Sequence, residues 1–583
     1  MQNVKEKKLN RLFVALAAVM VVLFSITLFK HLSYPLLWND EGDTAMFATR
    51  VLEYGFPKVY DGKNVVYVHP VDIKIGVNKF GMFVADPILI YYLAAPGAWL
   101  AEKVADVYDK TLLFRLPFAL AGLIGAFVMA IAGAGLFEKG RPGRPLFIAL
   151  FFLFATLSIS LALHLREARY YSPLVLFSAI LFYFHFKHRL LGESSYKAYF
   201  AVSVFMLFLV YNTFYPLYFM LLASIGLYEI FTLLGKMRKE RATGRALAPP
   251  GLKDLKPFIP LIVSFITVIP LMIFFRTIEV ALLKGSTVGF SMGRYIANLQ
   301  FIFGYFAKHE FLYIALMIKA ALAFVLLRGR ITGEALQEET ARKVSASNFL
   351  TLFFLVHVFV TAATPLMFTR YFIVLLPVVT VIMLLDAFTV FEIAKKFPAT
   401  SRKAWQGALV AASAALFILG LAGKAGDMLG RAYELTHQYK GPLDFVVPFV
   451  IENYERPEDI IIATNYEEAS LMYYTKSMVI IGFIGINLTE DMKETPDVII
   501  HRDFWPDIPY PFPALLQKAE YVKVAFPVRD YQVNNIPDLH ITPRHLYRTR
   551  TPPDRGRKHD HIRQEIAPVP PSAVKLNHRA API

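Results

Sequence analysis

The sequence predicts a polytopic α-helical membrane protein that carries a small α/β domain near its C-terminal end. Of its 583 residues, 56% are hydrophobic and only 18% are charged, whereas about 25% are charged in a typical soluble domain. Long apolar runs alternate with short polar clusters as far as about residue 423, and the composition then becomes ordinary. Most Lys and Arg residues lie in the short clusters between the apolar runs.

Composition divides the chain into three parts. Residues 1–423 are predicted to form the membrane domain, which includes a long first outer loop over residues 31–111. Residues 424–550 have the size and composition of one folded domain. Residues 551–583 are rich in Pro and Arg and contain few apolar side chains, which predicts a disordered, basic tail.

Eleven apolar segments are candidate membrane spans, each approaching the roughly 20 residues that a helix needs to cross a bilayer. They are about 12–30, 112–136, 145–164, 170–187, 198–211, 214–234, 257–276, 311–327, 347–363, 371–391 and 404–423. The first is predicted to be a retained signal-anchor helix, because it is too long for the core of a signal peptide. Segment 87–104 contains Pro96 and Gly97 and is predicted to lie at the outer interface.

The distribution of basic residues predicts how these spans are oriented. With the N-terminus inside, every predicted inner loop is rich in Lys or Arg, namely 138–144, 187–197, 235–256, 328–343 and 395–403. Because eleven is an odd number, the first loop and the C-terminal domain then lie outside the cytoplasmic (inner) membrane. The same rule accounts for the formal net charge of +16, so nucleic-acid binding is not predicted. Cysteine is absent, which excludes disulfides and thiolate metal sites.

Three carboxylates, Asp40, Glu41 and Asp43, lie where the chain leaves the first span. The following residues, 44–54, have the spacing of an amphipathic helix lying on the membrane surface. One interpretation is that the acids favour the positive end of this helix, with Asn39 or Asp40 as its N-cap. The other is that they supply a general base or a cation ligand, which requires a carboxylate whose pKa is near working pH.

Four further motifs follow in order along the predicted outer side: Ala85–Leu93, Phe114–Pro117, Arg166–Tyr171 and Thr369–Pro377. Together with the acidic cluster, they resemble motifs of the GT-C membrane glycosyltransferases. The likeness is greatest to the branch that holds protein O-mannosyltransferases and lipid A aminoarabinose transferases, and it covers about residues 10–390. The resemblance implies a GT-C-like enzyme that takes a sugar from a polyprenyl-phosphate donor. The sugar would pass to a glycolipid, glycan or protein acceptor outside the cytoplasm, with membrane lipid as a further partner.

The resemblance also implies roles for individual residues. Asp40 leads the family-like acidic pair and is the predicted base, supported by Glu41 or Asp43. A departing lipid phosphate develops negative charge, which cations placed in advance can stabilise. The candidates for binding the donor phosphate are Arg169, Arg370, Arg166, Lys79 and Tyr371. Arg115 is predicted to be structural and to pair with a neighbouring helix.

Asp86 departs from the family pattern, because relatives often carry Lys at this point. Lys74 or Lys79 would then take over the contact with the donor phosphate, and Asp86 itself is an additional candidate. Arg294 is a further candidate in loop 277–310, whose glycines predict either a mobile loop that closes over the substrate or a solvated connector. A divalent cation is compatible with the acids, although no set of metal ligands can be assigned.

Helices and apolar strands alternate after residue 443, which predicts a small α/β layer. The predicted elements are a helix over Phe445–Asn453, a strand over 459–464, a helix over 467–475 and strands over 478–482 and 497–501. A glycine-rich fingerprint does not follow any of these strands. A nucleotide cofactor is therefore not predicted.

Two other functions remain open at this stage. A transporter or flippase for lipid-linked glycans should carry ionisable residues deep in its spans. Lys319 is the main example here, while Asp386 and Glu229 lie near predicted inner ends, which favours an enzyme. An oligosaccharide ligase or oligosaccharyltransferase fits the outer acids equally well and differs chiefly in moving a whole glycan. The sequence identifies neither the sugar, the polyprenol nor the acceptor.

Overall fold

The computed structural model describes residues 2–66, 76–242, 252–286, 291–310, 312–331, 337–364, 367–396, 403–436, 440–482, 485, 487–502, 512–528 and 573–577. The chain forms two compact units. The membrane unit comprises Met1–Phe29, Ala119–Arg166 and Tyr170–Gly430, and the α/β unit comprises Lys30–Phe118, Glu167–Arg169 and Arg431–Ile583. The first loop therefore groups with the C-terminal domain, although the sequence placed it in the membrane domain.

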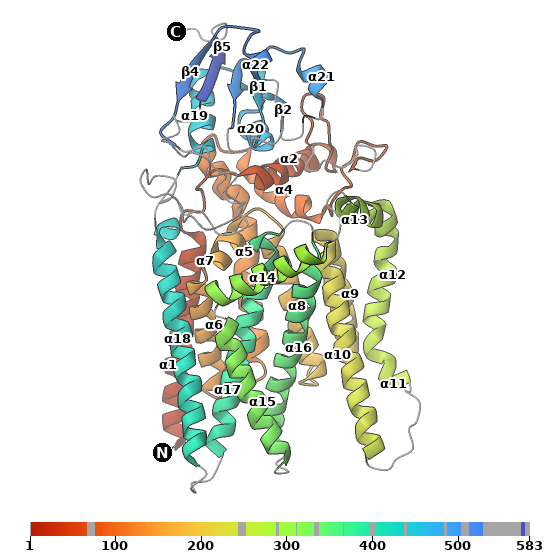
Figure 1. The fold of residues 1–583 in the computed structure, drawn as a ribbon, viewed down its shortest axis with the longest axis vertical. Coiled ribbons are helices and arrows are strands. Elements are labelled where there is room, and N and C mark those ends of the chain that lie inside the picture. The colour runs from red at the N-terminus through yellow and green to blue at the C-terminus, as the bar shows by residue number, and fades with distance from the viewer. Residues whose placement is uncertain are drawn as a thin grey trace. The chain divides into compact units, whose positions relative to one another are not determined.

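The membrane unit is built from helices (Figure 1). In chain order they are α1 (Gln2–Phe29), α5 (Val107–Ala134, which begins in the α/β unit), α6 (Gly143–Leu157), α7 (Ile159–Arg166), α8 (Tyr171–Arg189), α9 (Tyr196–Thr213), α10 (Tyr215–Ala242), α11 (Leu252–Leu255), η1 (Lys256–Phe258), α12 (Ile259–Phe274), α13 (Thr277–Ser286), α14 (Met292–His309), α15 (Leu312–Ile331), α16 (Glu338–Thr361), η2 (Thr369–Phe372), α17 (Leu375–Lys396) and α18 (Lys403–Thr436).

The polytopic membrane fold predicted from the sequence is confirmed, but the number of eleven spans is not. Among the described residues, six helices are long and apolar enough to cross a membrane, or up to eight if each of two bent pairs is one span. The six are Lys5–Phe29, Val107–Ala134, Tyr215–Arg238, Lys256–Phe274, Glu338–Thr361 and Leu375–Ile393. The predicted spans 170–187 and 198–211 form α8 and α9, which are not among the six.

Each bent pair departs from the sequence prediction. The predicted span 145–164 consists of α6 and α7, which meet at 80° where the backbone of Ser158 is extended. The predicted loop 277–310 forms α13 and α14 instead, and α14 meets α15 at 88°. Glycines suggested a loop there, but Ile302, Phe306 and other side chains at helical spacing are buried along one face of α14.

Buried ion pairs hold the membrane unit together. At the break between α14 and α15, Glu310 accepts a hydrogen bond of 2.8 Å from Ser158 Oγ, at the break between α6 and α7. Lys424 of α18 forms an ion pair with the same carboxylate. Lys319 lies 3.1 Å from Asp386. The charges noted within the predicted spans are therefore neutralised by partners inside the helix bundle.

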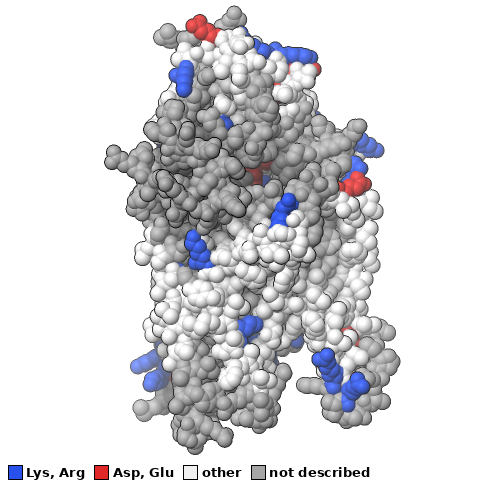
Figure 2. Space-filling model, in the orientation of Figure 1, with Lys and Arg blue, Asp and Glu red and all other residues white. Residues whose placement is uncertain are grey.

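The ends of the membrane helices agree with the charge pattern. Figure 1 shows the start of α1, the end of α10, helix α11 and the end of α15 at the same end of the membrane unit. These are the segments whose basic residues predicted one common side. On the face drawn in Figure 2, the described side chains of the long helices are mostly uncharged.

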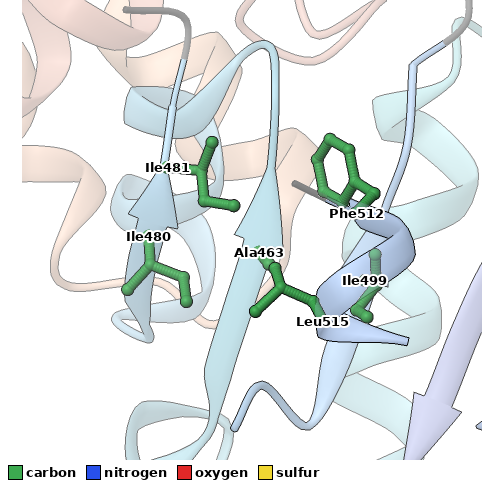
Figure 3. Close-up of a cluster of buried hydrophobic side chains, with 6 residues drawn as sticks. All are labelled: Ala463, Ile480, Ile481, Ile499, Phe512 and Leu515. Atoms are coloured by element: carbon green, nitrogen blue, oxygen red, sulfur yellow. The ribbon is translucent and has the colours of Figure 1, made fainter. Parts of the chain in front are cut away.

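The α/β unit contains one five-stranded sheet with the order β2-β1-β3-β5-β4. Strand β1 is parallel to β2 and β3, and β5 is antiparallel to β3 and β4. The elements from the C-terminal part are α19 (Leu443–Asn453), η3 (Pro457–Asp459), β1 (Ile461–Thr464), α20 (Glu468–Thr475), β2 (Met478–Ile481), α21 (Leu488–Asp491), β3 (Val498–Ile500), α22 (Phe512–Leu515), β4 (Tyr521–Ala525) and β5 (Ala573–Asn577). Figure 3 shows the core that packs on the sheet, with Ala463, Ile480, Ile481, Ile499, Phe512 and Leu515.

The predicted alternation of helices and strands between residues 443 and 501 is confirmed. The stretch 551–583 differs from its prediction as a disordered tail, because five of its residues form β5. Their sequence, Ala573–Asn577, alternates apolar and polar residues at Val574, Lys575 and Leu576, which is the period of a strand. The sequence analysis missed this short strand because Pro and Arg residues surround it.

The first loop contributes α2 (Asn39–Tyr54) and α4 (Leu89–Ala101) to the α/β unit. As predicted, α2 ends at Gly55, which has φ 80° and donates its N–H to Val51 O. The helix does not expose one face as an interfacial helix would, because it packs against both α4 and α20. The N-cap is Trp38 and makes no side-chain capping bond, so the prediction of Asn39 or Asp40 as N-cap is wrong.

Long-range hydrogen bonds attach the first loop to the C-terminal elements. Asn64 donates to Ser477 O at 2.9 Å and accepts from Val479 N at 2.8 Å, beside β2. The backbone N–H of Leu36 donates to Asp444 Oδ1 at 3.2 Å. The α/β layer and the first loop are therefore one folded body, and the acids of α2 lie inside it.

Candidate active site

Helix α2 approaches α20 closely at Gly42. A Cβ atom at this position would lie 2.2 Å from Ser470 Oγ, 2.6 Å from Ser470 N and 2.9 Å from Ser470 Cα. Two of these atoms belong to the α20 backbone and cannot move without displacing the helix. Gly42 therefore determines how near α20 comes to the acidic residues on either side of it, Glu41 and Asp43.

Replacing Gly42 with Ala is expected to separate α2 from α20 and to destabilise the α/β unit by about 1–3 kcal/mol, the usual cost of overpacking. Gly304→Ala in α14 is the matched control, because its Cβ would meet nothing within 4 Å. Thermal unfolding of the purified variants in detergent measures the difference. A Gly42→Ala protein as stable as the Gly304→Ala protein would contradict the close contact.

Glu41 is fully buried and both of its carboxylate oxygens are occupied. Arg115 donates to them through Nε at 2.8 Å and Nη2 at 2.5 Å, and the N–H of Ala168 donates at 2.8 Å. Arg115 also donates to the carbonyl oxygens of Leu32 and Pro35. The predicted pairing of Arg115 with a neighbouring helix is confirmed. Glu41, which the sequence grouped with the reactive acids, has the contacts of a structural residue.

Asp40 lies beside Arg169, and both side chains are mostly buried. Arg169 Nη2 is 3.5 Å from Asp40 Oδ2, while Nη1 donates to Asp40 O at 2.9 Å and to Thr44 Oγ1 at 3.1 Å. The guanidinium is thus held across the first turn of α2. A predicted base and a predicted phosphate ligand, from motifs far apart in the sequence, are brought together in the α/β unit.

Asp43 is an acid of α2 whose environment strongly favours its neutral form. Its pKa is raised well above the ordinary value, first by burial and then by the negative charges of Glu468, Asp40 and Asp86, which outweigh the opposing effect of Arg169. Burial and these neighbouring charges therefore favour the protonated form of Asp43. Glu468, the first residue of α20, was not predicted as a site residue. A local signal could not have revealed it, because only the packing of α2 on α20 makes the two neighbours.

Asp86 belongs to the same group of charges, as its predicted role requires. It is half-buried, and its charge acts on both Asp43 and Tyr91. Burial is the main reason that the pKa of Tyr91 is raised, so its hydroxyl keeps its proton. Lys79 is exposed, with its ammonium 5.0 Å from the Phe80 ring. Lys74 lies outside the described residues.

The described part of the chain contains no group of three or more His, Cys, Asp or Glu side chains that could hold a metal ion. The acids of α2 and α20 are close enough to perturb one another electrostatically. Among the described residues, these acids do not form a set of metal ligands.

The membrane unit also contains a small pocket. It is lined by Tyr170, Tyr171, Leu174, Phe214, Leu217, His357, Arg370, Tyr371, Ile373 and Val374. Aromatic rings stack along it, with Tyr170 and Phe214 centroids 4.8 Å apart and Phe214 and Tyr371 centroids 6.5 Å apart. The Arg370 guanidinium lies 4.2 Å from the Phe368 ring.

The structure thus brings two of the predicted phosphate ligands, Arg370 and Tyr371, into one pocket. Phe214 and His357 were missed, and the Nε2 atom of His357 lies 3.0 Å from Tyr371 O. Phe214 is the residue between α9 and α10. Among the described residues, the set lining this pocket does not include Arg166, which is buried at the end of α7, or Arg294, in the first turn of α14.

Comparison with solved structures shows what the fold of the chain is similar to. ArnT from Cupriavidus metallidurans, bound to undecaprenyl phosphate, matches over 89% of this chain and 96% of its own, with 13% identity and a TM-score of 0.50. The Archaeoglobus fulgidus oligosaccharyltransferase in the apo form matches over 88% of this chain and 69% of its own, with 13% identity and a TM-score of 0.37.

A second structure of the Archaeoglobus fulgidus oligosaccharyltransferase, AglB with an inhibitory peptide and a dolichol-phosphate, matches over 80% of this chain and 64% of its own, with 12% identity and a TM-score of 0.34. No protein-family model and no curated protein matches the sequence. The predicted elements, the order of the outer motifs and the match along nearly the whole of ArnT agree. The chain is a polytopic membrane protein with the GT-C fold.

Proposed function

We propose that the protein is a glycosyltransferase that moves a sugar from a polyprenyl-phosphate donor to an acceptor glycolipid, glycan or protein on the outer face of the cytoplasmic membrane. The observation that carries the proposal is the pairing of Asp40 with Arg169 on the first turn of α2. This arrangement places a carboxylate that can accept a proton next to a cation that can bind a phosphate oxygen.

The reaction assigns a separate task to each group. The acceptor oxygen forms a bond to the anomeric carbon of the sugar, and the bond between that carbon and the phosphate oxygen breaks. The electron pair leaves with the phosphate, which becomes free polyprenyl phosphate, and the acceptor proton passes to the Asp40 carboxylate. Arg stabilises the charge that develops on the phosphate, because its planar fork can bind two oxygens at once.

Arg169 has a contact in the unliganded protein that a phosphate would change. Its guanidinium is 3.5 Å from Asp40 Oδ2, a distance longer than that of a charge-assisted hydrogen bond. In the proposal, the donor phosphate competes for this guanidinium, and the carboxylate of Asp40 then turns to the acceptor.

The Arg370 pocket supports a second contact with the lipid donor. Its stacked aromatic rings provide apolar surface for a prenyl chain or for the face of a sugar. Arg370 adds one positive charge to this lining. We assign Arg370 and Tyr371 to the donor, as the sequence motif around them predicts.

Binding of a bare lipid phosphate tests this assignment without a known sugar. We expect undecaprenyl phosphate to raise the Tm of the purified protein, whereas undecaprenol, which lacks the phosphate, does not. Arg169→Ala and Arg370→Ala should each weaken binding by about 10-fold to 100-fold, since a hydrogen bond to a charged group contributes about 1.5–3 kcal/mol.

Arg141→Ala is the control for loss of a positive charge, because Arg141 is exposed and pairs only locally with Glu138. If both site variants bind undecaprenyl phosphate as tightly as the Arg141→Ala protein, neither arginine holds the donor phosphate. The same preparation, supplied with donors that carry one sugar or an oligosaccharide, separates a glycosyltransferase from an oligosaccharide ligase or oligosaccharyltransferase.

The transporter alternative is less well supported. Lys319 forms an ion pair with Asp386 and accounts for the main charge within a predicted span. Glu229 pairs with Arg189 near the predicted inner side. Because these charges are satisfied within the helix bundle, they do not mark a path for a polar headgroup.

A further inference from the structure

We propose that Glu468, which the C-terminal α/β layer contributes, is a positioning residue of the acidic site and shares one proton with Asp43. The inference rests on the proposed function and extends it, because it assigns a catalytic duty to a domain outside the family-like region of about residues 10–390. By holding Asp43 neutral, Glu468 leaves Asp40 as the acid of α2 that is ionised beside Arg169.

The packing of two helices brings Glu468 to this place. Gly42, next to Asp43 on α2, contacts Ser470, which is two residues after Glu468 on α20. The Glu468 carboxylate also lies against Gly482, where a Cβ atom would be 3.1 Å from Oε1, and its Oε2 atom is buried. The side chain is therefore confined between the end of β2 and the acids of α2.

The side chain of Ser470 is a second observation that points to a ligand where α2 and α20 meet. The side chain is fully buried, and among the described residues its hydroxyl has no hydrogen-bond partner. It faces α2 beside Asp43. An unpaired buried hydroxyl costs free energy that a partner would recover. We assign this donor to a group that arrives with the substrate, such as a hydroxyl of the acceptor.

The charges that act on Asp43 come from four segments of the chain. Asp40 lies on α2 itself, Glu468 on α20, Asp86 just before α4, and Arg169 in the short 167–169 segment. Tyr91 of α4 keeps its proton, as described above. Of these charges, Glu468 has the largest effect on the Asp43 pKa and raises it. Because like charges disfavour ionisation of both carboxylates, we infer that the pair retains one proton.

Glu468→Gln tests the pair, because it removes the charge and keeps the size of the side chain. The titration of the pair should appear as one limb of the profile of kcat/KM against pH. In Glu468→Gln, we expect this limb to move to lower pH by about one unit or more. Glu468→Asp keeps the carboxylate and should restore much of the wild-type profile. Glu452→Gln, an exposed acid on α19, is the matched control and should leave the profile unchanged.

A second measurement does not require sugar transfer. Because the folded pKa of Asp43 is raised, the folded protein binds this proton more tightly than the unfolded chain. This stabilisation is fully present below the unfolded pKa of about 3.9 and is lost as pH rises toward the folded pKa. We therefore expect the Tm to fall with rising pH in this window, and to fall less in Glu468→Gln than in wild type or Glu452→Gln.

The outcomes separate this inference from the proposed function. If Asp40→Asn abolishes transfer but Glu468→Gln has the wild-type pH profile and the wild-type dependence of Tm on pH, Glu468 is not part of the site. The opposite result is also possible: the Tm measurements support the shared proton, but the Asp40→Asn variant transfers sugar at the normal rate. In that case Glu468 and Asp43 share a proton, and the assignment of Asp40 as the base is wrong.

Discussion

Asp40→Asn is expected to lower the rate of sugar transfer by about 10²–10⁴-fold, the usual loss when a general base is removed. Asparagine keeps the size of the side chain and cannot accept the acceptor proton. The structure makes this substitution cleaner than the sequence suggested, because Trp38 and not Asp40 is the N-cap of α2. Asp40→Asn also removes the charge partner of the mostly buried Arg169, so the Tm of the variant is measured beside its rate of transfer.

The measurement is the initial rate of transfer from a polyprenyl-phosphate sugar by purified protein that still binds undecaprenyl phosphate. Asp109→Asn is the control, since Asp109 is an exposed acid in the first turn of α5. Turnover within a few-fold of the Asp109→Asn protein would exclude Asp40 as the base. Asp43 and Asp86 would then be the acids to examine, because both carboxylate oxygens of Glu41 already accept hydrogen bonds from Arg115.

Breaking the pair between Glu41 and Arg115 is expected to destabilise the folded protein by about 3–5 kcal/mol, because one buried charge remains without its partner. Glu41→Gln leaves the Arg115 guanidinium in a site that is almost completely shielded from water. Arg115→Met leaves the carboxylate and removes the hydrogen bonds to Leu32 O and Pro35 O. We expect both single variants to give little folded protein.

The double variant Glu41→Leu with Arg115→Met separates charge from packing. It buries no unpaired charge, so it should be more stable than either single variant, although the carbonyl groups of residues 32 and 35 lose their donor. Asp459→Asn is the control for an exposed pair in the same unit, and it should change stability by about 1 kcal/mol or less. Single variants as stable as this control would refute the structural role of Glu41.

Local patterns in the sequence predicted many, but not all, elements of the fold. Apolar runs predicted membrane helices. Spacings of three and four residues predicted α2, and spacings of two residues predicted the strands of the C-terminal layer. These periods can be read locally because they reflect the geometry of one element. The same patterns failed at α14, where glycines suggested a loop, and at β5, where a five-residue strand lies among Pro and Arg. The order of the outer motifs pointed to the fold that the structure shows.

The differences among the acids were decided by tertiary structure alone. Asp40, Glu41 and Asp43 are nearly equivalent in sequence, yet Arg115 neutralises Glu41, Arg169 lies beside Asp40, and burial together with the charge of Glu468 raises the pKa of Asp43. Each of these partners is distant in the chain, so it leaves no periodic trace near residue 40. The charge state of a carboxylate depends on its burial and on the charges within a few ångströms of it. Both are set only when α2, α20 and the 167–169 segment pack together.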